Sequence, residues 1–396
     1  MTDFPKTVDE LSSEWLNAVL PFTDQDIKGF EATIIGVGEG FMGQLARVEL
    51  TYGSSAKSSS ADSSTADRNP REDAPRAIIA KFASTQTKTR MMAKEQNYYA
   101  KEIGFYNDIG HDVGVKIPTC FHTSHNLDTN HFVILLEDLA PAIASDQVEG
   151  TSIEGSRQVI EAFAAIHAKW WNSERLASYD WAQPWVNAKP IKESLEVLKY
   201  SIKQADETGR FDRYPEINKL KYMLPPLCHM EPPPPFPYTL NHGDLRSDNV
   251  FLPGPDGGEF AMIDWQLTGM AQPMTDIARW LTQSITVEQR RETEQELLKL
   301  YHDRLVEYGV KDYSYKQMMQ EYKLNLVVLL FMFTMTMDDI DQTPDRAEAF
   351  FHALYSRLDA ALVDWKVVNI LKVLPYLTPF IKLSTWLKMK FKKSSK

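Results

Sequence analysis

Hydrophobic and polar residues alternate differently in successive parts of the chain, and the changes predict its secondary structure. Apolar residues recur at helical spacing over 8–20, behind Thr7 as a cap. Residues 30–52 show the alternation of two strands joined by a turn. Four glycines lie in that turn: Gly36, Gly38, Gly40 and Gly43. A third strand is predicted over 76–83 and a long helix over 88–109.

Farther along the chain, residues 117–139 predict a loop with His122 and His125, followed by an apolar strand. Residues 241–266 contain two apolar runs on either side of a turn rich in glycine and proline, which predicts a hairpin. The other segments predict helices, at 153–171, 192–224, 287–307, 314–337 and 344–363. A strand-rich first part and a helical remainder predict an α+β protein.

A polar segment interrupts the strand-rich part. Residues 53–76 include seven serines within 54–64 and almost no large apolar side chains. Such a segment buries too little apolar surface to offset the entropy of ordering it. We therefore expect a disordered insertion between two strands, and we expect function to survive its deletion.

Composition narrows the class of protein. The chain has 396 residues and a net charge of −11, which argues against nucleic acid as a partner and suits a cationic or neutral substrate. Cys120 and Cys228 are the only cysteines, so a reducing compartment is expected. The first residues lack the pattern of a secretory signal, and the apolar run 324–337 is too short to span a bilayer. These features predict a soluble, cytoplasmic protein.

The hairpin at 241–266 carries the most specific chemistry. Asp244 and Asn249 are five residues apart, and Asp264 follows fifteen residues later. Kinases place a base Asp and a metal-binding Asn at this spacing, then a second metal-binding Asp after a short hairpin. The pattern predicts Asp244 as the base that accepts the proton of a hydroxyl, with Asn249 and Asp264 as ligands of Mg²⁺.

The residues around these positions resemble a particular group of kinases. His-Gly-Asp at 242–244 and Ile-Asp-Trp at 263–265 resemble the aminoglycoside phosphotransferase and choline kinase-like families. Trp-Gln after Asp264 and the opening "DELSSEWL" are most similar to bacterial phosphotransferases related to the ecdysteroid kinase-like proteins. The resemblance covers about 11–360. It implies a protein-kinase-like fold of two lobes, with a nucleotide-binding lobe at 1–137 and a catalytic, acceptor-binding lobe at 138–396.

The resemblance also implies the residues that bind nucleotide. Lys81, on a predicted strand, would hold the phosphates of ATP, and a helix carboxylate would hold Lys81. Glu95 and Glu102 share a face of the predicted helix, and the motif Glu-Ile-x-Phe-Tyr favours Glu102. The turn with Gly38 and Gly40 would close over the phosphates. Main-chain groups near Glu137 and Leu139 would contact adenine.

Other polar residues have supporting roles in this interpretation. His167 is expected to be a core histidine and His242 to support the loop. Asp276 either steadies the loop, as in the resembling families, or caps a helix. Arg246 and Asp248 are candidate acceptor contacts.

The sequence thus predicts an enzyme that transfers the γ-phosphoryl of ATP to a hydroxyl of a small molecule resembling an aminoglycoside, choline, a steroid or another metabolite. A regulatory protein that binds Mg-ATP with weak catalysis is the alternative. A protein kinase is disfavoured, because the short segment between Asp264 and Asp276 has no room for an activation segment. The basic tail at 381–396 suits either an anionic membrane surface or a frayed terminus.

Overall fold

The structure, a computed structural model, describes residues 4–20, 26–36, 43–53, 74–183, 191–229, 237–335 and 344–374. The chain divides into two units. The N-terminal unit comprises the described residues within 1–143 and 251–266, and the C-terminal unit comprises those within 144–250, 267–339 and 344–396. The predicted lobe boundary after residue 137 stays a prediction.

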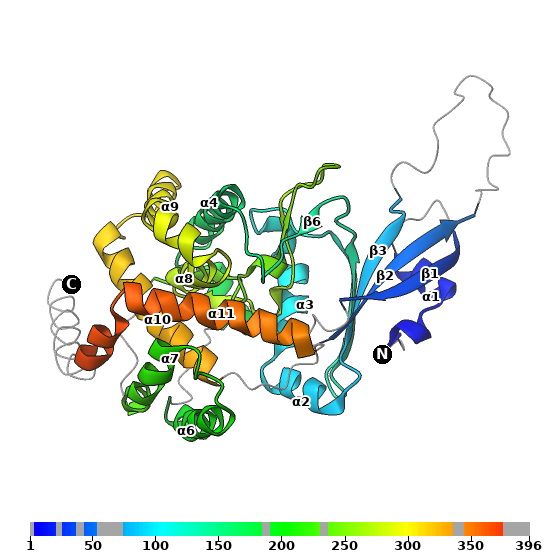
Figure 1. Cartoon of the computed structure of the whole chain (residues 1–396). Helices are drawn as coiled ribbons and strands as arrows, with labels where there is room; N and C mark the ends of the chain where they lie inside the picture. The colour runs from blue at the N-terminus through cyan, green and yellow to red at the C-terminus, as the bar shows by residue number, and fades with distance from the viewer. Residues whose placement is uncertain are drawn as a thin grey trace, which may run out of the picture. The chain divides into compact units, whose positions relative to one another are not determined.

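An antiparallel sheet is the centre of the N-terminal unit (Figure 1). Within the described residues it has five strands in the order β1-β2-β3-β5-β4. The strands are β1 (Ile27–Ile35), β2 (Gly43–Tyr52), β3 (Ala77–Ala83), β4 (Cys120–Asn126) and β5 (His131–Glu137). In this register Lys81 of β3 is paired with Leu45 of β2 and Ile134 of β5. The strands predicted within 30–52 and at 76–83 are confirmed.

The two faces of β3 have different surroundings. Ile78, Ala80 and Phe82 are buried in one core together with Leu16 of α1 (Ser13–Val19). Successive side chains of a strand point to opposite faces, so Lys81 lies on the face away from this core. The helix predicted over 8–20 begins later than expected, because Ser12 has extended backbone and accepts a hydrogen bond from the N–H of Trp15.

The helix predicted over 88–109 is two helices, α2 (Thr87–Glu95) and α3 (Tyr98–Asp108). Between them Asn97 adopts a left-handed backbone with φ of 56°. Asparagine tolerates this conformation better than most residues, and a helix cannot continue through it. The expectation of one continuous helix was therefore wrong.

The histidines expected in a loop lie in a strand instead. His122 and His125 belong to β4, where both side chains are half-buried. His122 contacts Ser124 at 2.8 Å and packs edge-on against Trp15, and His125 contacts Asn130 at 3.0 Å. The loop prediction was wrong because β4 pairs along its length with β5, which no local pattern indicates.

The predicted hairpin is present with shorter strands, β8 (Val250–Leu252) and β9 (Ala261–Met262). A third short strand, β6 (Ile143–Ala144), pairs with β8. At the turn Gly254 and Gly257 exchange two main-chain hydrogen bonds of 2.7 and 3.0 Å. Gly257 has a φ of +100°, a value that favours glycine.

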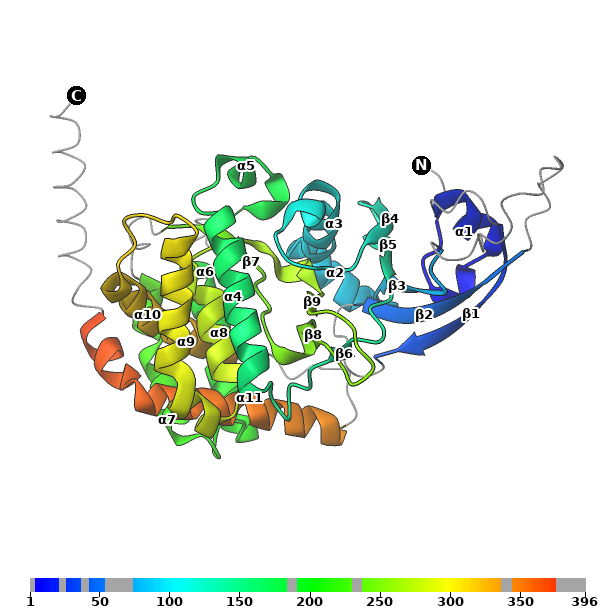
Figure 2. The same ribbon diagram turned by 90° about the horizontal axis from the view of Figure 1, so that it is seen from above.

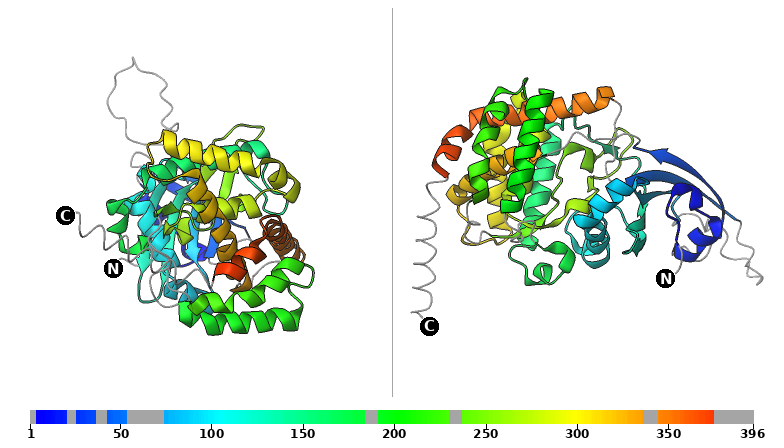
Figure 3. Two further views of the ribbon diagram at one scale, coloured as in Figure 1. Left: turned by 90° about the vertical axis from the view of Figure 1, so that its left-hand side faces the viewer. Right: turned by 90° about the horizontal axis from the view of Figure 1, so that it is seen from below.

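The C-terminal unit is built mainly of helices (Figure 2). They are α4 (Ile153–Lys169), α5 (Glu174–Ala177), α6 (Ile191–Thr208), α7 (Pro215–Leu220), α8 (Met274–Gln283), α9 (Val287–Glu307), α10 (Tyr315–Met335) and α11 (Pro344–Asp364). α8 is buried on most of its surface and packs against α9, α10 and α11, while α4 packs along α9 (Figures 2 and 3). A two-stranded sheet pairs β7 (Thr239–Asn241) with β10 (Gly269–Ala271).

The predicted helices after residue 280 agree closely with α9, α10 and α11. The segment 192–224 differs, because α6 ends before Gly209, whose φ is +67°. Short 3₁₀ helices in the described residues are Val8–Glu10, Gly110–Asp112, Asp180–Ala182, Lys221–Met223, Pro225–His229, Ser247–Asn249 and Trp265–Leu267. None of the helices in the described ranges is long and apolar enough to cross a membrane.

Candidate functional site

A lysine between two carboxylates is the main polar feature of the sheet in the N-terminal unit. The Nζ of Lys81 lies 2.8 Å from Oε1 of Glu102 and 2.8 Å from Oδ1 of Asp264. Glu102, on α3, is fully buried, and Lys81 is 8% exposed. We call these three residues the lysine cluster. A buried ammonium with two charged partners has a fixed position and can present its remaining hydrogen-bonding capacity to an anion.

The charges of the lysine cluster depend on one another. Burial lowers the pKa of Lys81, but the Asp264 and Glu102 carboxylates outweigh it, and the pKa is raised above its ordinary value. Burial raises the pKa of Glu102, and the Lys81 ammonium opposes this change. The lysine therefore stays protonated and cationic.

An aromatic stack sets the position of Asp264. Trp265 is fully buried, and its ring lies parallel to that of Phe105 on α3, with centroids 4.1 Å apart. The N–H of Met262 donates to the carbonyl of Lys116 at 3.1 Å, which fixes the start of the same segment. Asp264 itself adopts a left-handed backbone with φ of 65°, which turns the chain between β9 and Trp265.

The structure distinguishes between the two candidate glutamates. Glu102 contacts Lys81, whereas Glu95 lies at the end of α2 and is exposed. Because the left-handed Asn97 separates their helices, the two glutamates do not share the face of one helix. The structure shows the ion pair between Lys81 and Glu102, and the role of this pair in binding nucleotide stays a prediction.

The loop that follows β7 is the main polar feature of the C-terminal unit. Its main chain is held by Asp276 of α8, whose side chain is fully buried. The N–H groups of His242 and Gly243 donate to the two carboxylate oxygens of Asp276 at 2.7 and 2.9 Å. Asp276 makes no side-chain cap of its helix, whose N-cap is Pro273. Of the two roles expected for Asp276, the structure shows the contact with the loop.

His167 of α4 lies behind this contact. Its Nδ1 lies 2.6 Å from the hydroxyl of Tyr301, and its carbonyl accepts a hydrogen bond from the hydroxyl of Thr239 at 2.8 Å. Its Nε2 is 3.6 Å from Oδ2 of Asp276, too far for a hydrogen bond. Burial lowers the pKa of His167, and the Asp276 carboxylate opposes this. The prediction of a core histidine is confirmed.

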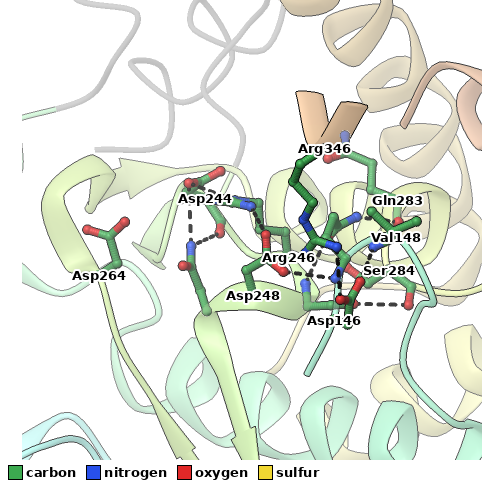
Figure 4. A network of polar contacts seen from close by, with 12 residues as sticks. Asp146, Val148, Asp244, Arg246, Asp248, Asp264, Gln283, Ser284 and Arg346 are labelled. Atoms are coloured by element: carbon green, nitrogen blue, oxygen red, sulfur yellow. Dashed lines mark hydrogen bonds and ion pairs between the residues drawn. The ribbon is translucent and has the colours of Figure 1, made fainter. Parts of the chain in front are cut away.

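Two arginines contact Asp244, which is 8% exposed. Figure 4 shows one of them, Arg246, beside Asp244. Nη2 of Arg279, on α8, forms an ion pair with Oδ1 of Asp244. Nε of Arg246 lies 3.3 Å from Oδ2 of Asp244. Burial raises the pKa of Asp244, but the Arg279 and Arg246 guanidinium groups and His242 outweigh it and hold the pKa well below the ordinary value. Asp244 is therefore a carboxylate at neutral pH.

Asn249 contacts Asp244 through its side-chain nitrogen. Nδ2 of Asn249 donates to the main-chain carbonyl of Asp244 at 2.9 Å and lies 3.4 Å from Oδ2. The amide oxygen of Asn249 has no hydrogen-bond partner within the described ranges. We call Asp244, Arg246, Asp248, Asn249 and Arg279 the loop cluster.

The residues predicted to hold Mg²⁺ fit the donor chemistry of that ion. Mg²⁺ prefers oxygen ligands and is commonly bound by one or two protein side chains together with phosphates and water. Asn249 offers an amide oxygen, and the Asp264 side chain, 20% exposed, offers a carboxylate. In the part of the chain that the structure describes, no group of three or more His, Cys, Asp or Glu side chains is arranged to hold a metal.

Arg246 and Asp248, predicted to contact an acceptor, have partners within the protein. Nη1 of Arg246 forms an ion pair with Asp248, and its guanidinium group lies 5.3 Å from the ring centroid of Phe350 on α11. The N–H of Gln147 donates to Oδ1 of Asp248 at 2.8 Å. These contacts hold the loop in place, and direct contact with an acceptor stays a prediction.

A second group of contacts supports the loop from the segment before α4. Oε1 of Gln147 accepts a hydrogen bond from the N–H of Ser247 at 2.8 Å, and Nε2 of Gln147 donates to the carbonyl of Gln283 at 2.6 Å. Arg357 of α11 donates to the carbonyls of Gln147 and Gln283 at 2.8 and 2.6 Å. Figure 4 shows Gln283 and Asp248 in the same network of polar contacts. The loop is thus fixed by residues from several elements of the unit.

The segment after β5 contains the predicted adenine contacts. The N–H of Glu137 donates to the carbonyl of Thr119 at 2.9 Å, and the Glu137 side chain binds Lys116 at 2.9 Å. The carbonyl of Leu139 accepts a hydrogen bond from Ala142 at 2.9 Å. These groups already have partners, whereas the N–H of Leu139 has none among the described residues and is the better candidate for a ligand contact.

Some predicted features lie outside the described residues. They are Gly38 and Gly40, most of the 53–76 insertion and the basic tail at 381–396. At the ends of the glycine turn, Gly36 has a φ of +63°, and a Cβ on Gly43 would lie 2.4 Å from the carbonyl oxygen of Phe82. Both of these positions require glycine.

Arg279 was not identified from the sequence. Arg279 is three residues after Asp276, so the two side chains lie on one face of α8. The expected contact between Asp276 and the loop was therefore a signal that could have pointed to Arg279. An arginine at such spacing is common on any helix, and its contact with Asp244 depends on how β7 and α8 pack.

Comparison with solved structures relates the fold to known proteins. A choline kinase from Cryptosporidium parvum Iowa II is 10% identical, with a TM-score of 0.53 over 90% of this chain and 97% of that chain. A protein from Ralstonia eutropha JMP134, assigned as an aminoglycoside phosphotransferase, is 13% identical, with a TM-score of 0.50 over 90% and 97%. At these identities the similarity concerns the fold. The predicted kinase-like α+β fold of two lobes is confirmed.

Comparison with sequences gives the family. A search of curated proteins finds no match. The model of the ecdysteroid kinase-like family, in contrast, matches residues 37–315, well over half of the chain, and spans both the lysine cluster and the loop cluster. The predicted relationship is confirmed, and the protein belongs to the ecdysteroid kinase-like family.

Proposed function

We propose that the protein transfers the γ-phosphoryl group of ATP to a hydroxyl group of a small molecule. The loop cluster carries the proposal, because it places a buried, ionised Asp244 in contact with Asn249 at the spacing typical of kinases. Membership of a kinase-like family supports the same reaction.

In the proposed reaction the acceptor oxygen attacks the γ-phosphorus of ATP. The bond between that phosphorus and the oxygen that bridges to the β-phosphate breaks, and ADP leaves with the electron pair. Asp244 orients the acceptor hydroxyl and takes its proton as the new bond forms. Phosphoryl transfer passes through a loose transition state, so positioning by Asp244 contributes more than its basicity.

The lysine cluster binds nucleotide in this proposal. Lys81 contacts the phosphates of ATP, and Glu102 keeps its ammonium group in place. Asn249 and Asp264 are the proposed ligands of Mg²⁺, which when bound neutralises charge on the phosphates. The turn with Gly38 and Gly40 is proposed to cover the phosphates.

Adenine is proposed to meet the main chain between Glu137 and Leu139. The N–H of Leu139 is the specific donor that we assign to this contact, since the Glu137 N–H and the Leu139 carbonyl are already paired. A main-chain N–H can donate to an acceptor atom of either adenine or guanine, so the assay should include both ATP and GTP.

The test is turnover by the purified protein with Mg²⁺ and ATP or GTP. Acceptors should include a hydroxylated steroid, choline, ethanolamine and an aminoglycoside, with product identified by ³¹P NMR. We expect one acceptor class to stimulate ADP release and to gain a phosphoryl group. Asp244→Asn should abolish this transfer while leaving nucleotide binding measurable by calorimetry.

A matched control separates catalysis from general damage. Asp256 lies exposed in the turn between β8 and β9, so Asp256→Asn makes the same chemical change close by in the sequence and should leave turnover unchanged. Equal turnover by Asp244→Asn and the wild type would refute the assignment of the base. Firm Mg-ATP binding without transfer to any acceptor would favour a regulatory protein instead.

A further inference from the structure

One turn of α8 holds the loop at three consecutive residues. Asp276 accepts the N–H groups of His242 and Gly243, and Arg279 lies three residues later on the same face of the helix. Nη1 of Arg279 lies 3.4 Å from the carbonyl of Gly243, and Nη2 pairs with the side chain of Asp244. Within the loop, Asp276 therefore contacts main-chain groups, whereas Arg279 reaches the Asp244 carboxylate itself.

The two oxygens of Asp244 have different surroundings. Oδ1 pairs with Arg279. Among the described residues, Oδ2 has only long contacts, 3.3 Å to Nε of Arg246 and 3.4 Å to Nδ2 of Asn249. Hydrogen bonds of this length are weak, so Oδ2 is the oxygen that can take a new donor.

Arg246 cannot replace Arg279 in this role. Its guanidinium group is already paired with Asp248 and packs on the ring of Phe350. Arg279 is more than 85% buried as a side chain, and its only charged partner among the described residues is Asp244. A buried arginine with a single carboxylate partner fixes the orientation of that carboxylate strongly.

We propose that Arg279 is a positioning residue, which holds Oδ1 of Asp244 and thereby presents Oδ2 to the hydroxyl of the acceptor. This inference rests on the proposed function. The hydroxyl donates to Oδ2, its oxygen forms the bond to the γ-phosphorus, and the proton remains on Oδ2 until the products leave. Arg279 neither gains nor loses a proton.

The first test is a double-mutant cycle with Arg279→Met and Asp244→Asn. The probe is Mg-ATP with water as acceptor, followed by ADP release, and any acceptor found in the panel is then used in the same way. Arg279→Met should lower kcat about 100-fold, as expected for a misplaced reacting group, with little change in KM for ATP. In the Asp244→Asn background the same change should have almost no further effect, because Arg279 acts through Asp244.

Two further variants distinguish positioning from support of the fold. Arg279→Lys keeps the charge and should recover part of the lost kcat, although a single ammonium cannot span Gly243 and Asp244 as the guanidinium does. Arg157→Met removes an arginine that is paired with Glu296 on α4 and α9, and it should leave kcat unchanged. If Arg279→Met has wild-type kcat while Asp244→Asn is inactive, the inference is wrong and the proposed function stands.

A measurement that needs no turnover completes the test. The melting temperatures of the wild type, the two single variants and the double variant report whether Arg279 and Asp244 are coupled. We expect the double variant to melt well above the temperature predicted from the sum of the single losses, because each single change leaves a buried charge without its main partner. Additive losses would overturn the inference whatever the assay shows.

Discussion

Trp265 lies flat against Phe105, with ring planes 8° apart and centroids 4.1 Å apart. Phe105 is three residues after Glu102 on α3, and Trp265 directly follows Asp264. The stack therefore ties together the two segments that bring carboxylates to Lys81. An aromatic side chain at position 265 has a structural role that is separate from the chemistry of its neighbour.

Loss of the stack should weaken this part of the N-terminal unit. We expect Trp265→Leu and Phe105→Leu each to lower the free energy of unfolding, by roughly 2–4 kcal/mol, since both rings are fully buried. In urea titrations the double variant should reveal a coupling of about 0.5–1.5 kcal/mol, the contribution of the aromatic pair beyond burial. A coupling near zero would mean that the rings stack without stabilising the segment.

Substitution of Lys81 should lower the stability of the protein. Lys81→Met leaves Glu102 and Asp264 without their shared cation, and breaking a buried ion pair in this way costs about 3–5 kcal/mol of stability. Addition of Glu102→Met should recover part of that loss, because a buried charge is removed. Equilibrium unfolding in urea measures both effects.

The same lysine variant tests nucleotide binding. Calorimetry with Mg-ATP should show at least about a tenfold loss of affinity for Lys81→Met, if Lys81 holds the phosphates. Lys28→Met is the control, because Lys28 is exposed on β1 and its one ion pair in the described ranges is with Asp26, which is also exposed. Unchanged affinity in Lys81→Met would remove the lysine cluster from the proposed nucleotide site.

His167 should make stability depend on pH. The groups that face it in the described part of the C-terminal unit are Asp276 of α8 and Tyr301 of α9. Burial lowers the pKa of His167 in the folded protein, so below about pH 6.5 the unfolded chain binds a proton that the folded chain does not. The free energy of unfolding should therefore be unaffected by His167 above that pH and should fall as the solution is acidified below it.

The contribution of His167 can be isolated by substitution. Below pH 6.5 the free energy of unfolding of the wild type should fall more steeply than that of His167→Gln, by up to about 1.4 kcal/mol per pH unit. His131→Gln is the control, because His131 at the start of β5 is only half-buried, whereas His167 is fully buried. Parallel curves for His167→Gln and the wild type would show that His167 is protonated in the folded state.

Replacement of residues 54–73 by a short glycine and serine linker should preserve the protein. The chain on either side of this segment is already paired. The N–H of Leu50 donates to the carbonyl of Arg76 at 2.8 Å, and the hydroxyl of Tyr52 donates to the carbonyl of Pro75 at 2.9 Å. We expect the melting temperature to change by less than a few degrees and turnover to be retained. A large loss of turnover with normal melting would assign the segment a functional role.

Local sequence pattern was sufficient to identify many residues of the candidate site. The spacing of Asp244, Asn249 and Asp264, the lysine in an apolar strand and the glycines at the ends of the turn are all visible in the sequence. The sequence reveals these features because each depends on local geometry. The local rules are the alternation of side chains along a strand, the five-residue spacing of Asp244 and Asn249 in a loop, and backbone conformations that only glycine adopts easily. The same local rules predicted α9, α10 and α11 with nearly correct ends.

Other features depend on contacts between distant segments, and only the tertiary structure decided them. The break at Asn97, the strand that holds His122 and the partners of Arg246 and Asp248 come from pairing across the fold, which local propensity does not encode. Arg279 is the clearest case. In sequence it is an ordinary helical arginine, and it becomes the partner of Asp244 only because α8 packs against the loop, where a buried charge must find an opposite charge.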